Sequence, residues 1–253
     1  MKIRIGKIAL GAILPAALLA GWFYITSTGS LSESELPKPI SVYKVIFELL
    51  HRGELWWNIS ASIQRVLLGY LFGVVLALIL GSLAGLNKTI HAAITPILNA
   101  IRAVPSLAWV PLILIWLGIG ETPKITLIAI GAFFPVFTTV VSGIRNVDRA
   151  LIEVGRAYGL KRFGLVFKIY LPAAAPQIFS GLRLGLAQAW LFLVAAELIA
   201  SARGLGFLLI DSQSSARTDI VIFAIITLAL LGKFTDFLLA KVEKRVLAWN
   251  FIH

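Results

Sequence analysis

The sequence predicts an all-α, polytopic membrane protein with six transmembrane helices, and three observations support this prediction. Hydrophobic residues make up 59% of the 253-residue chain and charged residues 14%, whereas about a quarter of an ordinary soluble domain is charged. Several uncharged runs approach or reach the roughly 20 residues with which a helix crosses a bilayer. The net charge of +11 lies at the ends of these runs and not along one face that would bind nucleic acid. We therefore expect membrane lipid, and no nucleic acid, around the chain.

The first predicted span covers residues 8–25, which are uncharged and follow a basic start. A secretory signal peptide begins in the same way, but this run has no clear small-residue cleavage site and leads into further spans, so it is kept as a span. A polar loop is expected over 26–62, with an amphipathic segment at 42–50. Trp56 and Trp57 are expected to close that loop as anchors at the membrane–water boundary.

The second predicted span, 66–86, contains no charged residue. It carries two pairs of glycines at a spacing of four, Gly69–Gly73 and Gly81–Gly85. Small residues at this spacing let two helix backbones approach closely. We expect this face to pack against another helix.

The third predicted span, 93–116, contains Pro96, Pro105 and Pro111. A proline inside a helix removes a hydrogen-bond donor and clashes with the preceding turn, so this span should be bent or broken. Irregular backbone at membrane depth is tolerated in the protein interior or beside a water-filled path. This span is therefore a candidate element of a translocation path.

The last three predicted spans are 125–144, 176–200 and 220–240. With six spans both termini lie on one side, and lysine and arginine predict which side it is. Thirteen of these basic residues lie in the tails and loops on the side of the termini, against six in the opposite loops. The positive-inside rule then places both termini, and the segment 145–172, in the cytoplasm.

The segment 145–172 stands out as a basic, polar block between two membrane-length runs. It carries six basic residues against two acidic ones, and its apolar residues recur at helical spacing. A structured block of this kind differs from a disordered charged tail, and it is typical of a docking surface.

Several kinds of chemistry are missing from the sequence. There is no cysteine, and His51, His91 and His253 lack neighbours at metal-ligand spacing, so no metal site is expected. The stretch 81–89 is the nearest to a phosphate-binding loop, and it lacks the Gly-Lys-Thr sequence. No hydrolase motif occurs. We expect no catalytic residue, so uphill transport would draw its energy from a partner or an ion gradient.

Ionisable groups inside predicted spans are candidates for function because burying charge in a membrane is costly. Arg102 lies in the broken third span, and Arg183 and Glu197 share one face of the fifth with Trp190; Gln188 lies off that face. Arg183 and Glu197 are about 21 Å apart along a helix, so each needs another partner. The stripe could line a path for an anion. Alternatively, Arg183 reaches the interface and Glu197 ties the helix to a neighbouring loop.

A motif in the basic block resembles a known one. Glu153-Val154-Gly155, then Gly159, then Ile169-Tyr170-Leu171-Pro172 is similar, with every spacing kept, to the EAA motif of ABC importer permeases. Val154-Gly155 stands where that family usually has two alanines. Further stretches are similar to the permeases for nitrate, bicarbonate, taurine and aliphatic sulfonates, the carboxyl-terminal part most of all to the sulfonate permeases. These stretches are 102–125, 133–148, 195–209 and 230–236.

The resemblance implies a single transmembrane permease domain over 1–253, with type I ABC importer architecture, in the bacterial inner membrane. It implies a homodimer of two permease copies, two cytoplasmic ATPase subunits that bind ATP and Mg²⁺, and an extracytoplasmic substrate-binding protein. No cofactor would bind to this chain itself. The expected substrate is a small organic or inorganic anion, aliphatic sulfonate first, with taurine, nitrate and bicarbonate as alternatives.

The same resemblance assigns the 145–172 segment to ATPase coupling. A short helix is expected over 149–158, with a sharp turn at Gly159, because glycine tolerates positive φ, and with Pro172 starting the next element. Two short helices joined at a glycine would form a rigid knob that fits an ATPase groove. The residues expected to serve coupling are Glu153, Val154, Gly155, Tyr158, Gly159, Leu160, Leu171 and Pro172.

Two other classes of protein remain open at this stage. An ion-coupled secondary transporter would rely on carboxylates inside its spans, and here Glu197 and Asp236 qualify, both near span ends. A structural or assembly membrane protein would need none of the broken-helix features of 93–116.

Overall fold

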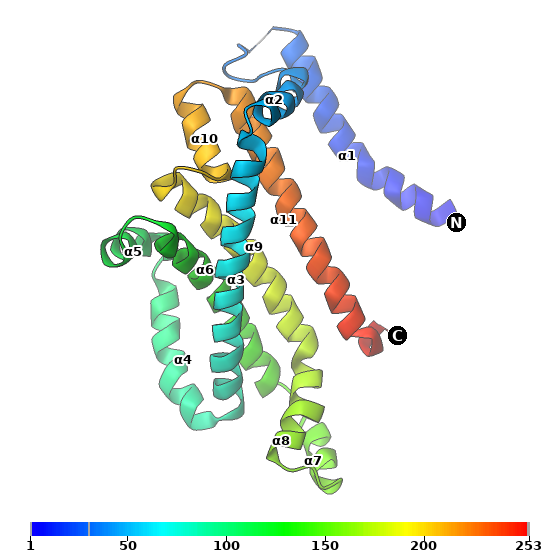
Figure 1. Ribbon diagram of the computed structural model, residues 1–253. Coiled ribbons are helices and arrows are strands. Elements are labelled where there is room, and N and C mark those ends of the chain that lie inside the picture. The colour runs from blue at the N-terminus through cyan, green and yellow to red at the C-terminus, as the bar shows by residue number, and fades with distance from the viewer. Residues whose placement is uncertain (1, 30, 252–253) are drawn as a thin grey trace.

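A computed structural model describes residues 2–29 and 31–251, and every regular element within these residues is helical (Figure 1). The helices in chain order are α1 (Lys2–Ser27), α2 (Pro39–His51), α3 (Glu54–Leu86), α4 (Lys88–Ala103), a 3₁₀ turn (Ser106–Trp109), α5 (Val110–Leu117), α6 (Glu121–Arg145), α7 (Arg149–Ala157), α8 (Arg162–Leu165), a π-helical turn (Val166–Tyr170), α9 (Leu171–Ala200), α10 (Leu205–Ser214), α11 (Thr218–Val246) and a 3₁₀ turn (Ala248–Phe251).

Helix α6 is the centre of the molecule because it packs along both α3 and α9. Its fully buried residues include Val136, Phe137 and Val140, which form one apolar core with Ala77 of α3 and Ala174 of α9. Figure 1 shows these three long helices side by side, with α7 and α8 at one end of the body and α2 and α10 at the other. The helical body therefore has two opposite ends, each formed by shorter helices and loops.

The glycines of α3 confirm the predicted close helix packing. A Cβ atom on Gly69 would lie 2.6 Å from the side chain of Ile128, and one on Gly73 would meet the backbone carbonyl of Ala129. Farther along, Gly81 faces Val140 in the same way. Since α3 and α6 touch through backbone at these positions, small residues are a requirement of their contact.

We expect Gly73→Ala to lower the thermal stability of the detergent-solubilised protein. The new methyl group meets backbone, which cannot turn aside, so overpacking of roughly 1–3 kcal/mol outweighs the gain in helix propensity of about 1 kcal/mol. Gly21→Ala on α1 is the matched control, because nothing lies within 4 Å of its added Cβ. Equal melting temperatures for the two variants would contradict the assigned helix contact.

Within the described residues, four helices are long and apolar enough to cross a membrane, so the predicted count of six is not confirmed. They are α3, α6, the helical run 162–199 that contains α9, and α11. In the described residues, the apolar part of α1 is the shorter Ile13–Ser27. Figure 1 shows α1 extending away from the body, and a 3.0 Å hydrogen bond from Trp22 Nε1 to the carbonyl of Pro37 ties its C-terminal part to the segment before α2.

The predicted third span is broken, as its prolines indicated. Helix α4 ends at Ala103, and Val104 and Pro105 separate it from the 3₁₀ turn and α5. Pro96 lies inside α4 without ending it, and Pro111 lies in the first turn of α5, where its missing N–H is tolerated. Neither α4 nor α5 reaches membrane length, so 93–116 is not one spanning helix.

The predicted loop over 26–62 is wrong in its second half. The amphipathic segment is confirmed as α2, but α3 already begins at Glu54. Trp56 and Trp57 therefore lie in the first turn of that long helix, both more than half exposed. The loop expected after residue 200 likewise contains a helix, α10, which follows Gly204.

Candidate functional site

The segment between α6 and α9 folds as a short capped helix followed by a glycine turn. Asp148 caps α7 by accepting a hydrogen bond of 2.9 Å from the amide of Ala150. At the other end Gly159 has φ +77° and the amide of Leu160 donates to the carbonyl of Gly155 over 3.0 Å. This is a common helix C-terminus in which glycine adopts the left-handed conformation. The predicted helix and turn are both confirmed.

Gly155 explains where the chain departs from the EAA pattern. It is the buried residue of α7, and a Cβ atom there would meet Cδ1 of Ile169 and lie 2.9 Å from Cδ2 of Leu165. The short helix α7 is therefore seated directly on α8 and the π-helical turn. Leu160 closes the same contact, since its side chain lies 3.4 Å from the Gly155 Cβ position.

Helices α7 and α8, together with the turn at Gly159 that joins them, form a knob at this end of the molecule. Its outer face exposes several large apolar side chains. Tyr158 is 85% exposed and Phe163 is 80% exposed, and Val154 and Phe167 are also exposed. Glu153 lies exposed on the same helix. Large apolar side chains gathered beside exposed polar ones make this surface a candidate interaction site. Sequence reasoning missed Phe163 and Phe167, although their spacing of four within a polar block is the signal that would have found them.

Pro172 marks the start of α9, as predicted, but the helix does not begin anew there. Helical backbone runs from Arg162 through the π-helical turn into α9, with Leu171 and Pro172 half-buried at the junction. Pro172 has no N–H to offer the carbonyl of Lys168. A π-helical turn just before it accommodates that missing bond.

A second polar site lies at the opposite end of α6 and α9, around the buried guanidinium of Arg65 in α3. Its Nε and Nη2 donate to both carboxylate oxygens of Glu121 over 2.6 and 2.7 Å. Its Nη1 donates over 2.7 Å to Glu197 and over 2.7 Å to the carbonyl of Arg203. Arg65 therefore joins the start of α6 to the end of α9 and to the loop that follows it.

Glu197 is fully buried and has two hydrogen-bond partners besides Arg65. Its carboxylate accepts hydrogen bonds of 2.9 Å from the hydroxyl of Ser62 and of 2.8 Å from the amide of Gly206. Gly204, with φ +119°, leaves room for the carboxylate, because a Cβ atom there would clash with it. Asn58 holds the amide of Gly204 over 2.8 Å.

The charged groups of this network around Arg65 are all paired with opposite charges. Buried charges are costly unless they are paired and hydrogen-bonded, and here each carboxylate of Glu121 and Glu197 receives a guanidinium donor. Lys124, one turn along α6, adds a contact of 3.2 Å to Glu121. Through the amide of Gly206, Glu197 ties its helix to the first turn of α10, within the segment that was expected to be a loop.

The other predicted path residues lie apart from this network. Arg183 pairs with Asp236 of α11 over 2.8 Å, so it has the separate partner that its distance from Glu197 required. Trp190 is buried and donates to Thr235 of α11 over 3.0 Å. Gln188 and Arg102 are both exposed. A role of these side chains in a translocation path stays a prediction.

Sequence reasoning missed Arg65, Ser62, Glu121 and Lys124. Arg65 directly precedes the charge-free run of α3, and Glu121 and Lys124 directly precede that of α6. Charges at such positions look like ordinary ends of membrane spans. Two signals were usable. Glu121 and Lys124 are three residues apart and so share one face of a helix, and the predicted intramembrane carboxylate of Glu197 still needed a partner.

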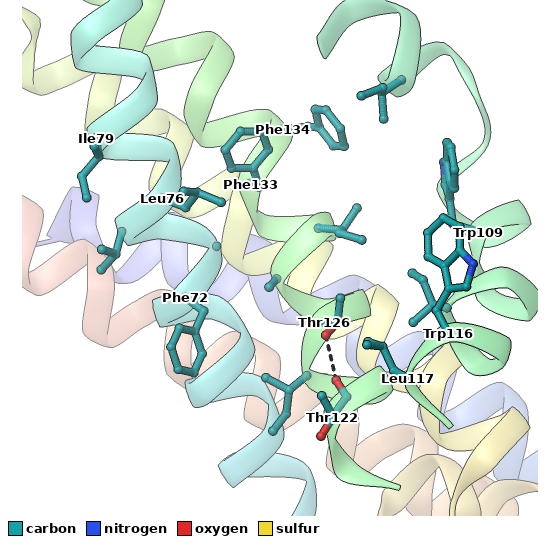
Figure 2. Close-up of a pocket in the computed structure, with 17 residues that line it drawn as sticks. Phe72, Leu76, Ile79, Trp109, Trp116, Leu117, Thr122, Thr126, Phe133 and Phe134 are labelled. Atoms are coloured by element: carbon teal, nitrogen blue, oxygen red, sulfur yellow. Dashed lines mark hydrogen bonds between the residues drawn. The ribbon is translucent and has the colours of Figure 1, made fainter. Parts of the chain in front are cut away.

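Two pockets lie beside these elements, and neither resembles a metal centre. The larger, about 1030 Å³, is almost entirely apolar and lies between α3, α5 and α6. Figure 2 shows Phe133 and Phe134 on its α6 side facing Trp109 and Trp116. The smaller, about 530 Å³, contains Arg65 and its neighbours. No group of three or more His, Asp or Glu within residues 2–29 and 31–251 could hold a metal ion; His253 lies outside them.

Comparison with known proteins gives consistent results. The family model described as "Binding-protein-dependent transport system inner membrane component" matches residues 73–248. The putative aliphatic sulfonates transport permease protein of Bacillus subtilis (strain 168) is 41% identical over 240 residues, which cover 95% of this chain and 87% of that protein.

Relatives with other described substrates are also similar. The taurine transport system permease protein of Escherichia coli (strain K12) is 33% identical, over 93% of this chain and 87% of its own length. The nitrate import permease protein of Leptolyngbya laminosa is 33% identical, over 93% and 86%. Among solved structures, an inward-facing methionine ABC transporter matches with a TM-score of 0.65 at 20% identity, covering 78% of this chain and 96% of that one.

Proposed function

This chain belongs to the family of binding-protein-dependent transport system inner membrane components, and from this premise we propose that two copies of it form the path by which an ABC importer moves a small anion, aliphatic sulfonate first. The chain is a permease subunit and not an enzyme, and ATP is hydrolysed on a partner subunit. One observation carries the proposal: the exposed apolar knob of α7 and α8, seated on the long helix that continues into α9.

The knob has the features of a rigid docking surface. Val154, Tyr158 and Phe163 expose apolar surface, while Gly155 locks α7 onto α8 and the π-helical turn. A groove in an ATPase subunit would cover this surface, with Glu153 at its edge. Movement of the ATPase dimer would then pull directly on α6 and α9, the two helices that the knob joins. ATP and Mg²⁺ would bind to those subunits.

The distribution of basic residues supports the orientation. The segment that contains the knob carries six of the 23 lysines and arginines, and such segments stay in the cytoplasm. The network around Arg65 lies at the other end of α6 and α9 and would therefore face the outer side of the bacterial inner membrane. There an extracytoplasmic binding protein would deliver the substrate.

The substrate proposal follows the relatives. The sulfonate permease of Bacillus subtilis is 41% identical, against 33% for the taurine and nitrate permeases. Aliphatic sulfonate therefore leads, with taurine, nitrate and bicarbonate as the alternatives. An ion-coupled mechanism has no support from the carboxylates, because both Glu197 and Asp236 are held in ion pairs.

The test is to reconstitute the permease with its ATPase and binding protein in proteoliposomes. Uptake of ethanesulfonate, taurine, nitrate and bicarbonate, measured with and without ATP inside the vesicles, identifies the substrate.

We expect Glu153→Lys and Tyr158→Asp to reduce ATPase stimulation by the loaded binding protein about tenfold, as loss of an interface hot spot does. Lys88→Glu, a charge change of the same size and opposite sign to that of Glu153→Lys, on the same side but away from α7, is the control. Intact stimulation in both knob variants would refute the coupling assignment.

A further inference from the structure

The smaller pocket lies where α3, the start of α6 and the end of α9 meet. Its volume is about 530 Å³, and it is open on one side. Its lining residues are Trp57, Arg65, Ile119, Gly120, Glu121, Lys124, Ile199, Ser201, Ala202 and Arg203. These residues include three cationic side chains and one carboxylate, so the pocket carries an excess of positive charge even when the Glu197 carboxylate paired with Arg65 is counted.

Lys124 is the first sign that the pocket takes a ligand. Its side chain is 5% exposed, and its ammonium group makes one contact among the described residues, 3.2 Å to Glu121. An ammonium group carries three hydrogen-bond donors. Glu121 is held much more closely by Arg65, at 2.6 and 2.7 Å. Lys124 is therefore a buried cation with donors to spare.

Ser201 is the second and independent sign. Its hydroxyl oxygen is buried, and among the buried side-chain nitrogen and oxygen atoms of the described residues it is the one without a hydrogen-bond partner. A buried hydroxyl left without a partner costs free energy. An oxygen-bearing ligand in the pocket would remove that cost by accepting from the hydroxyl.

Arg203 supplies a third donor group at the pocket wall. Its guanidinium stacks over the ring of Trp57 at 4.9 Å, and no carboxylate among the described residues pairs with it. Its backbone carbonyl accepts from Arg65 over 2.7 Å, which fixes the loop in place. The Arg203 side chain is thus positioned by an aromatic ring and free to bind an anion.

We infer that this pocket is an anion subsite, in which Lys124, Ser201 and Arg203 bind the oxyanion group of the transported solute after the binding protein releases it. The inference rests on the proposed function. Ile119, Ile199 and Trp57 form apolar walls beside the donors, and they would contact the alkyl group of an organic sulfonate. Glu121 stays with Arg65, so the arriving anion takes over the weaker contact to Lys124.

The experiment uses the complete transporter in proteoliposomes, with the anion that the wild type transports. Uptake and ATP hydrolysis are measured together, and their ratio is the readout. We expect Lys124→Met to lower uptake per ATP about tenfold, since it removes a charged hydrogen bond to the solute. Lys124→Arg keeps the charge and should restore most of the uptake. Ser201→Ala should lower uptake per ATP about threefold without altering the charge.

Lys38→Met is the matched control. Lys38 is an exposed lysine on the same side of the membrane, and it pairs with Glu33 at 3.1 Å. This variant should leave uptake per ATP unchanged. If the wild type shows no ATP-dependent uptake of any anion, the proposed function itself fails. If the wild type transports and both Lys124→Met and Ser201→Ala match it, the proposed function stands and the subsite is refuted. Should Lys124→Met fail to assemble, Ser201→Ala decides alone.

A lipid phosphate is the other source of an oxyanion at this depth. The measurements are therefore repeated in vesicles of phosphatidylcholine alone and in vesicles containing phosphatidylglycerol. A subsite for the solute predicts the same loss in both. A loss that appears only with phosphatidylglycerol would identify a lipid headgroup as the occupant and overturn the inference.

Discussion

Arg65→Ala is expected to lower the stability of the permease far more than removal of an exposed charge does. The guanidinium is 3% exposed and donates to two carboxylates, of which Glu197 is completely buried. Without Arg65 the Glu197 carboxylate keeps only the hydroxyl of Ser62 and the amide of Gly206. Breaking a buried pair in this way costs about 3–5 kcal/mol. We expect the melting temperature in detergent to fall by roughly 10 °C.

Arg52→Ala is the control for this variant. Arg52 pairs with Glu48 at 2.7 Å one turn earlier on α2, but its side chain is 54% exposed. An exposed pair of this kind contributes about 0.5 kcal/mol. If Arg65→Ala and Arg52→Ala melt at the same temperature, the Arg65 network does not hold α3, α6 and α9 together. Glu197→Ala should behave like Arg65→Ala, since it leaves the guanidinium with Glu121 alone.

Gly155→Leu is expected to uncouple ATP hydrolysis from transport. The new side chain would occupy the space of Ile169 and Leu165, on which α7 sits. Overpacking of this kind costs roughly 1–3 kcal/mol. A nine-residue helix held by few contacts can avoid this cost by moving away from Leu165 and Ile169. We expect ATPase stimulation by the loaded binding protein to fall about tenfold. Hydrogen exchange of the amides in 149–159 should rise in parallel.

Ala173→Leu provides the comparison, because it adds an equally large side chain at an exposed position just beyond the same segment. It should preserve both stimulation and exchange protection. Gly155→Ala should be tolerated, since its methyl group meets the flexible end of Ile169. Full stimulation in Gly155→Leu, with unchanged exchange, would show that the seat of α7 is irrelevant to coupling.

Much of the α7 region could be predicted because its signals are local. Asp148, Gly159 and Pro172 each act on backbone within a few residues of themselves, through a cap, a left-handed turn and a missing donor. The same holds for the break after Ala103. The glycines of α3 could also be interpreted from spacing alone, although the sequence did not name α6 as their partner.

The Arg65 network could not be predicted because its contacts join distant parts of the chain. Arg65 lies 132 residues from Glu197 and 56 residues from Glu121. Each charge lies at the end of an apolar run, where composition alone indicates an ordinary membrane boundary. The predicted number of spans was not confirmed for a related reason. Pro105 predicted the break in the third span, but no local signal predicted the lengths of α4 and α5, the two helices on either side of it.

The unbroken helical run from Arg162 to Glu197 makes the two ends of the permease parts of one lever. These 36 residues span roughly 53 Å at about 1.5 Å rise per residue. Each degree of tilt at the knob therefore displaces the Glu197 end by roughly 1 Å, about a third of the length of the hydrogen bonds that hold it. A rotation of a few degrees is enough to pull the carboxylate out of reach of Ser62 and Arg65. The hydrogen bonds around Glu197 are therefore sensitive to small rotations of this helical run about its α8 end.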